Sequence, residues 1–242
     1  MFMVSKIKKI IAENKARQEE QIYQAKELEW AHIYHDSIRG KRGIEDLPLN
    51  IGRWAGNYSF FYVLNRILSD YKPKAILDLG LGESSKFISA YLENYLLDSK
   101  HTIVEQDEEW AKEFQLRVSL AKNSNIVYCP IKTREINGYK SNSYDGFDEK
   151  IKGKFDLYII DGPFGSERYS RYDIISKIEE LNSEDEFIIL FDDTDRRGEK
   201  DTLKEIIRIL KNKKVNIFVG NYVGNKTNTV LATNKYKFAT SL

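Results

Sequence analysis

The stretch AILDLGLGESS, residues 75–85, decides how the rest of the chain can be arranged. Its first part, residues 75–79, is a short apolar run and predicts a buried strand. Gly80 and Gly82 allow a tight turn and a close approach of the backbone to a ligand, and a helix is expected to begin near Ser84. A strand, a glycine turn and a helix in this order predict a ligand site at the carboxyl edge of a parallel sheet.

The same alternation continues along the chain. Apolar runs predict strands at 101–104, 126–129, 155–160 and 187–191, and helical periodicity predicts helices at 57–70, 84–97, 108–120, 172–181 and 202–212. Two β-rich runs, 215–223 and 227–232, flank Gly224-Asn225 and predict a closing C-terminal hairpin. Residues 132–144 are predicted to be a polar connection without a strand. This alternation predicts an α/β fold with a doubly wound, mainly parallel, seven-stranded sheet.

The N-terminal part of the chain differs in composition from the rest. Residues 2–38 are rich in Lys, Glu, Gln and Ala and contain no proline or glycine, which predicts one long helix or two. We therefore divide the chain into a helical extension, 1–50, and an α/β domain, 51–242. Ile7, Ile10 and Ile11 share one helical face beside lysines, so the extension is expected to pack on the domain or on a second subunit in a homo-oligomer. Attachment to a membrane surface is the alternative.

The bulk composition argues against several classes of protein. The 242 residues contain 38 Lys and Arg against 37 Asp and Glu, so no nucleic-acid partner is expected. The single cysteine, Cys129, rules out an internal disulfide framework. We find no apolar run of about 18 residues that would span a bilayer and no signal peptide. A cytoplasmic location is the resulting expectation.

The glycine turn favours one kind of ligand over two others. A dinucleotide fingerprint requires a third glycine where this chain has Ser85, and the lysine of a P-loop is absent. The segment instead resembles motif I of class I S-adenosylmethionine (SAM)-dependent methyltransferases. The resemblance implies a Rossmann-like fold in which Asp78 lies near the methionyl ammonium of SAM and Gly80 and Gly82 make room for it. The predicted cofactor site also includes the helix start, Glu83, Ser84 and Ser85.

The end of the second predicted strand adds a carboxylate. Glu105 follows the strand at 101–104, and a carboxylate there can accept hydrogen bonds from both ribose hydroxyls. The resemblance assigns this role to an acidic residue at this place. Gln106 is then expected beside the adenine.

Carboxylates also follow the fourth and fifth predicted strands. Asp161 ends one strand, and Asp192 and Asp193 end the next, so the three side chains are expected to meet at one sheet edge. Asp161 and Asp192 are the predicted catalytic residues, because a carboxylate there can take the proton of an attacking hydroxyl, and Asp161 also borders the cofactor. Alternatively Asp161, Asp192 and Asp193 bind Mg²⁺, as the resemblance to metal-dependent catechol-type O-methyltransferases implies, although Asp193 stands where those enzymes have Asn. A purely structural role, in which Asp192 or Asp193 caps the next turn, remains open.

The blocks around these acids resemble a more specific family. Asp161-Gly162-Pro163-x-Gly165 and Asp192-Asp193-x-Asp195-Arg196-x-x-Glu199, with arginines between them, are similar to the polysaccharide-biosynthesis family that contains plant glucuronoxylan 4-O-methyltransferases. This resemblance covers roughly residues 73–200 and implies a glycan or uronic-acid acceptor. Because arginines bind carboxylates and tyrosines pack on sugar faces, the predicted acceptor-binding residues are Arg168, Tyr169, Arg171 and Arg196, although these residues could simply solvate a helix start.

The sequence thus predicts a SAM-dependent O-methyltransferase that acts on a carbohydrate or another polar hydroxyl acceptor. Assistance by a divalent cation such as Mg²⁺ is left open. A non-catalytic protein that binds SAM or a nucleotide on the same fold is the alternative, because a fold does not determine a function.

Overall fold

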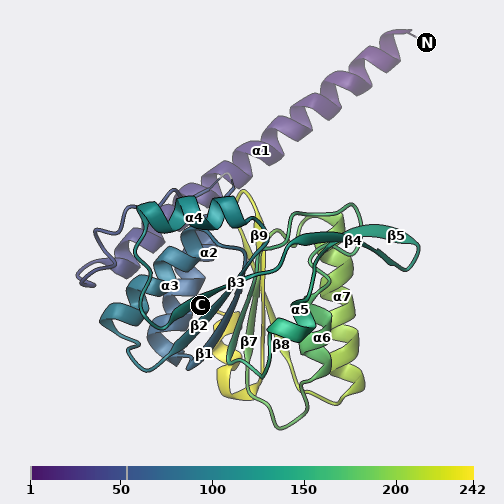
Figure 1. Ribbon diagram of the computed structural model, residues 1–242. Coiled ribbons are helices and arrows are strands. Elements are labelled where there is room, and N and C mark those ends of the chain that lie inside the picture. The colour runs from purple at the N-terminus through teal and green to yellow at the C-terminus, as the bar shows by residue number, and fades with distance from the viewer. Residues whose placement is uncertain (1, 53) are drawn as a thin grey trace.

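The computed structural model describes residues 2–52 and 54–242, and its centre is a seven-stranded sheet with helices on both faces (Figure 1). The strand order is β3-β2-β1-β6-β7-β9-β8. The strands are β1 (Ala75–Leu79), β2 (Lys100–Glu105), β3 (Ser124–Tyr128), β6 (Leu157–Ile160), β7 (Ile188–Phe191), β8 (Phe218–Val223) and β9 (Thr227–Ala232). From β3 to β7 all pairs are parallel, whereas β9 runs antiparallel to β7 and β8. The predicted fold class is therefore confirmed.

Helices cover the two faces of the sheet in separate apolar clusters. The helices are α1 (Phe2–Ile38), α2 (Tyr58–Arg66), the π-helical η1 (Ile67–Tyr71), α3 (Glu83–Asn94), α4 (Glu108–Arg117), α5 (Phe147–Lys150), α6 (Ile174–Glu179), α7 (Arg197–Asn212) and the 3-10 helix η2 (Asn234–Thr240). One cluster joins α1, α2 and α3 to the sheet, and the other joins α5, α6 and α7. Ile76 and Leu77 of β1 belong to different clusters, because successive side chains of a strand point to opposite faces.

The order of the strands and the faces that their helices cover determine where a ligand can bind. Strand β1 lies between β2 and β6 and is parallel to both. The helix that follows β1, α3, packs on one face, whereas α6, which follows β6, packs on the other. The connections therefore diverge at the carboxyl ends of β1 and β6, and such a switch point leaves a crevice in which ligands bind.

The polar stretch 132–144 was predicted to lack strands, and this prediction is wrong. It forms a hairpin of β4 (Ile131–Ile136) and β5 (Tyr139–Tyr144), paired in a separate two-stranded sheet. Residues 131–135 are all exposed, so no buried side alternates with an exposed one to reveal the strand. The turn is Asn137-Gly138, both at positive φ, the residues that a tight two-residue hairpin turn prefers.

Within the extension, residues 2–38 form one continuous helix, α1, most of which stands clear of the domain (Figure 1). Every residue from 6 to 26 is exposed, whereas Tyr34 and Ile38 are buried against α2 and α3. None of the helices in the part of the chain that the structure describes is both long enough and apolar enough to cross a membrane.

Glu27 ties this helix to two other segments where it reaches the domain. Its carboxylate accepts hydrogen bonds from the Asn57 side chain (2.9 Å), the Tyr58 amide (2.8 Å) and the Asn225 amide (3.0 Å). Asn57 caps the start of α2, and Asn225 lies in the β8–β9 turn. One side chain therefore joins three parts of the chain that are far apart in sequence.

Candidate functional site

The glycine turn after β1 forms as predicted and opens the crevice. Gly80 has φ +109°, a conformation that side chains other than glycine rarely adopt, and its amide donates to the Val104 carbonyl (2.9 Å). Gly82 has an extended backbone, and a side chain placed there would meet no atom within 4 Å. Gly80 is therefore required by the turn, whereas Gly82 leaves open space at the cavity wall.

Asp78 lies behind this turn. Its carboxylate is fully buried and accepts hydrogen bonds from the Ser85 hydroxyl (2.6 Å) and the Ser84 hydroxyl (3.3 Å). Nε2 of His101 lies 3.4 Å from the same carboxylate. Of the predicted cofactor residues here, Gly80, Gly82, Glu83 and Ser84 line the cavity, whereas Asp78 and Ser85 do not. Asp78 therefore holds the loop in shape from behind, and a direct contact of Asp78 with a ligand stays a prediction.

Glu105, at the end of β2, borders the cavity beside Gln106. One carboxylate oxygen accepts from the Leu81 amide (2.9 Å), and the other accepts from the amides of Gln106 (2.7 Å) and Asp107 (2.8 Å). The side chain is buried yet borders the cavity. Burial raises the pKa of Glu105, and the three amides oppose that rise. Because Leu81 belongs to the glycine turn, Glu105 connects that turn to the end of β2.

The cavity has a volume of about 1080 Å³ and lies at the switch point between β1 and β6. It is lined by the glycine turn, the end of β2, and the turn 161–165 after β6. Contributors that were not predicted to form the site include Trp110 and Phe114 from α4, Phe164, and Lys226 from the β8–β9 turn. Trp54 stands at its mouth with 96% of its surface exposed.

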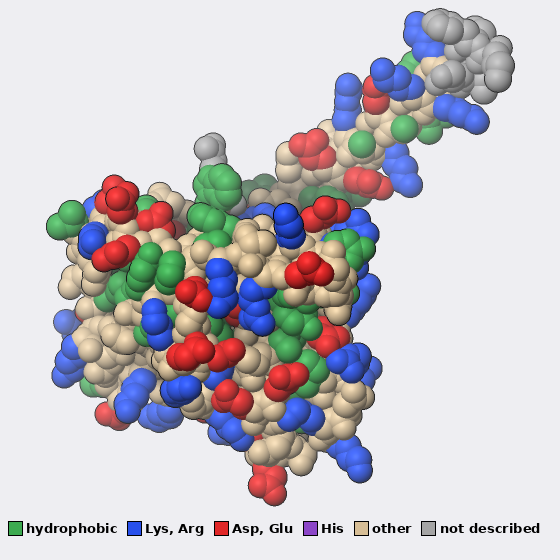
Figure 2. All heavy atoms as spheres, turned by 45° about the vertical axis from the view of Figure 1, so that its right-hand side comes forward, with side chains coloured by type: hydrophobic (Ala, Val, Ile, Leu, Met, Phe, Trp, Pro, Cys, Tyr) green, Lys and Arg blue, Asp and Glu red, His purple; other side chains and the backbone are tan. Residues whose placement is uncertain are grey.

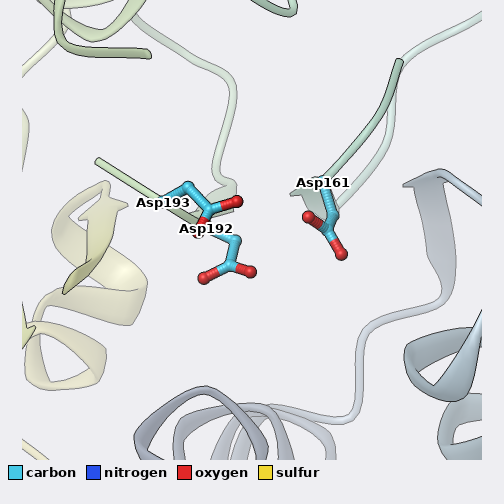
Figure 3. A group of neighbouring side chains, drawn as sticks. All are labelled: Asp161, Asp192 and Asp193. Carbon is cyan, nitrogen blue, oxygen red and sulfur yellow. The ribbon is translucent and has the colours of Figure 1, made fainter. Parts of the chain in front are cut away.

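The three predicted acidic residues do meet at the carboxyl ends of β6 and β7 (Figure 3). Oxygen atoms of Asp161, Asp192 and Asp193 lie within 4.8 Å of one another. The parallel register brings them together, because Ile160 and Phe191, the residues just before Asp161 and Asp192, are paired across the two strands.

Three cations already contact this cluster. The buried Arg171 guanidinium lies 3.1 Å from Asp161, 2.9 Å from Asp193 and 3.7 Å from Glu199. Arg196 pairs with Asp193 at 2.8 Å. The Lys226 ammonium lies 3.7 Å from Asp192 and 3.6 Å from Asp193. The four carboxylates are therefore largely neutralised by protein side chains.

The two predicted catalytic carboxylates differ in their access to the cavity. Asp192 is fully buried, whereas the Asp161 side chain is 23% exposed and lines the cavity. Burial and the neighbouring Asp192 raise the pKa of Asp161 to about 8, against the opposing charge of Arg171. Burial and Asp193 raise the pKa of Asp192 to about 6. Asp161 is the member of the pair that a ligand can reach.

The predicted acceptor-binding residues divide into two pairs. Arg171 and Arg196 line the cavity, whereas Arg168 and Tyr169 do not, and a contact of these two with an acceptor stays a prediction. Arg168 pairs with Asp201 of α7, and its guanidinium carbon lies 4.6 Å from the ring centre of Tyr139 and 5.4 Å from that of Tyr169. The β4–β5 hairpin and α7 thus hold Arg168 away from the cavity.

Comparisons with known proteins gave similar folds. No family model and no curated protein matches the sequence. Among solved structures, the precorrin-6y C5,15-methyltransferase from Geobacter metallireducens GS-15 is 16% identical, with a TM-score of 0.48 over 78% of this chain and 96% of that one. Cofactor-bound Rv0187 from MTB is 14% identical, with a TM-score of 0.48 over 76% and 84% of the two chains. The S-adenosylhomocysteine (SAH)-bound methyltransferase PaMTH1 from Podospora anserina is 14% identical, with a TM-score of 0.44 over 85% and 87%. Because all three TM-scores lie below 0.5, the function has to be inferred from the site itself.

Proposed function

We propose that this protein is a SAM-dependent O-methyltransferase. The observation that carries the proposal is one cavity lined by the glycine turn after β1, with the Glu105 carboxylate at the end of β2 on one side of that turn and the Asp161 carboxylate at the end of β6 on the other. The first side suits a nucleoside with a charged tail, and the second suits a hydroxyl group that must lose a proton.

The cofactor side has the groups that SAM requires. A carboxylate offers about four lone-pair sites, and backbone amides use three of those on Glu105, which leaves capacity for a ribose hydroxyl. Gln106, Trp110 and Phe114 supply a polar edge and aromatic surface for adenine. Gly82 leaves space for the methionyl part. When bound, SAM supplies a methyl group activated by its sulfonium.

Asp161 is the proposed base. An acceptor oxygen forms a bond to the methyl carbon while the carbon–sulfur bond breaks, and the hydroxyl proton passes to the Asp161 carboxylate. A base with a pKa near the working pH is well suited to this transfer, and burial beside Asp192 raises the pKa of Asp161 toward that range. Arg171 holds the carboxylate in place through its 3.1 Å ion pair.

The acceptor that these groups favour is a carbohydrate or another polar hydroxyl compound, including a uronic acid. Arg196 and Lys226 border the cavity near Asp161 and can bind an anionic group. The exposed Trp54 at the mouth offers a flat apolar surface. A role in polysaccharide biosynthesis in the cytoplasm follows from the sequence predictions and is part of this proposal.

The predicted Mg²⁺ site does not fit the charges around it. Arg171 and Arg196 both pair with Asp193, and Lys226 lies beside Asp192 and Asp193, so a divalent ion would have to displace these cations. We therefore expect methyl transfer to continue in the presence of EDTA and to gain nothing from added Mg²⁺. If EDTA abolished turnover and added Mg²⁺ restored it, a metal ion would have to bind the carboxylates in place of the arginine and lysine side chains.

Calorimetric titration with SAH tests the cofactor site. We expect the parent to bind SAH and Gly82→Val to bind at least about tenfold more weakly, a difference of about 1.4 kcal/mol, because the larger side chain fills open space. Gly82→Ala is the matched control with an intermediate loss, and thermal unfolding of each variant shows that it folds. Absence of binding by the folded parent would refute the proposal, whereas binding without turnover on a panel of glycans would favour the non-catalytic alternative.

A further inference from the structure

The projecting part of α1 carries a seam that no other segment covers among the residues that the structure describes. The seam consists of Ile7, Ile11, Asn14, Gln18, Gln21, Ala25 and Leu28. Their spacing alternates between four and three residues, the repeat by which two helices pack along each other. No charged residue occupies a seam position, although residues 6–29 include many lysines and glutamates. Ile7, Ile11 and Leu28 are 51%, 62% and 62% exposed.

The seam also faces away from the domain. Trp30, Ile33, Tyr34 and Ile38 are the α1 residues that pack in the apolar cluster shared with α2 and α3. Leu28 and Trp30 are two positions apart, which places them about 200° apart around the helix. Figure 2 shows the outer part of α1 standing clear of the body, with Lys and Arg side chains around it. The domain to which the helix belongs therefore cannot cover the seam.

The charges beside the seam decide whether two such helices would pack parallel or antiparallel. Residues 6–17 include the cations Lys6, Lys8, Lys9, Lys15 and Arg17 and one acid, whereas residues 18–29 include the acids Glu19, Glu20, Glu27 and Glu29 and one cation. A parallel pair would set the basic halves against each other. An antiparallel pair sets each basic half against an acidic half.

We propose that α1 pairs with the α1 of a second copy of this chain in an antiparallel coiled coil. In the register that the charges favour, Ile11 packs on Leu28 of the partner subunit, and the central amides of Gln18 and Gln21 meet. In this register Lys8 lies beside Glu29 of the partner subunit, and like charges do not meet across the dyad. Polar residues in such a seam specify orientation and register at some loss of stability.

Two measurements on the full chain test the pairing. In analytical ultracentrifugation we expect the parent to have twice the monomer mass and Ile11→Glu to have the monomer mass. Ala16→Glu is the matched control, because it adds the same charge to the same half of the helix outside the seam, and it should remain dimeric. Lys8→Glu should weaken the dimer, and Lys8→Glu with Glu29→Lys should restore it.

Cysteine cross-linking tests the direction, because the native Cys129 is buried. A mixture of Ile11→Cys and Leu28→Cys chains should form a mixed disulfide, whereas either variant alone should not cross-link. Cross-linking of each variant with itself would show a parallel pair and overturn the proposal. A parent that is monomeric at all concentrations and sediments with phosphatidylserine vesicles would overturn it in favour of membrane attachment.

Discussion

Arg171 stands among carboxylates contributed by three elements of the chain. It contacts Asp161 after β6, Asp193 after β7 and Glu199 of α7, and it also donates to the carbonyls of Ile160 and Asp192. A buried charge with this many partners contributes little net stability while complete, but its loss leaves the partners unpaired. Arg171 therefore holds the edge of the site together.

We expect Arg171→Gln to lower the free energy of unfolding by about 3–5 kcal/mol at pH 8, the usual loss when one partner of a buried ion pair is removed. The loss should shrink as the pH falls toward 5, because Asp161 and Asp192, with pKa values raised to about 8 and about 6, then take up protons. Denaturant unfolding at the two pH values measures this. Arg208→Gln, in an exposed pair with Glu205, is the control and should cost at most about 1 kcal/mol.

Asp161→Asn should lower the rate of methyl transfer by about 10²- to 10⁴-fold, the usual contribution of a general base, and leave SAH binding intact. In the parent the rate should rise with pH up to about 8, because only the ionised carboxylate accepts a proton and burial raises its pKa. Transfer of labelled methyl from SAM, followed from pH 5 to 9, measures both. Asp195→Asn should keep the parental rate, since Asp195 is exposed and bonds the Thr227 amide. A rate independent of pH above 5 would contradict the assignment.

The sequence predicted the residues of the site that end strands, because strand ends meet at a known edge of a parallel sheet. Gly80, Glu105, Asp161 and Asp192 belong to this group. It did not predict Lys226, which reaches the cluster from a hairpin turn distant in the chain. Nor did it predict that Arg168 pairs with Asp201, which lies on a helix that comes later in the chain.

At the scale of whole elements, strands were predictable where burial on both faces requires an unbroken apolar run, as in β1, β6 and β7. The β4–β5 hairpin has no such run, since most of it is exposed. The Asn137-Gly138 turn was the available signal. The structure shows what this hairpin contacts, because Tyr139 at its tip stacks on Arg168.

The junction at Glu27 leads to a prediction about the attachment of α1. Glu27→Ala should lower the free energy of unfolding by about 1–3 kcal/mol, because two backbone amides and the Asn57 amide lose their acceptor. Chemical denaturation measures this. Glu20→Ala, seven residues earlier on the same helix and exposed, should change the stability by less than about 0.5 kcal/mol. Equal effects of the two changes would mean that the junction does not hold the helix.

At the scale of the whole molecule, the proposed pairing through α1 would couple stability to concentration. The melting temperature of the full chain should rise with protein concentration, because a partner that binds only the folded state stabilises it. Removal of residues 2–25, which are exposed wherever their burial is described, should abolish that dependence without unfolding the domain. Differential scanning calorimetry over a hundredfold range of concentration measures this. A dependence that persists in the shortened chain would place the contact elsewhere.

The outward course of α1 also determines how two cavities would be spaced. In the proposed pair the stretch from residue 11 to residue 28 of one helix, about 27 Å at 1.5 Å per residue, lies along the same stretch of the partner's helix, and the two domains lie at opposite ends of this rod. A polymeric acceptor held in one cavity would then present its next free units to the second at a raised effective concentration, as bivalent binders do when the spacing matches the linker. Long chains would therefore be retained through avidity, whereas single sugars would gain nothing from it.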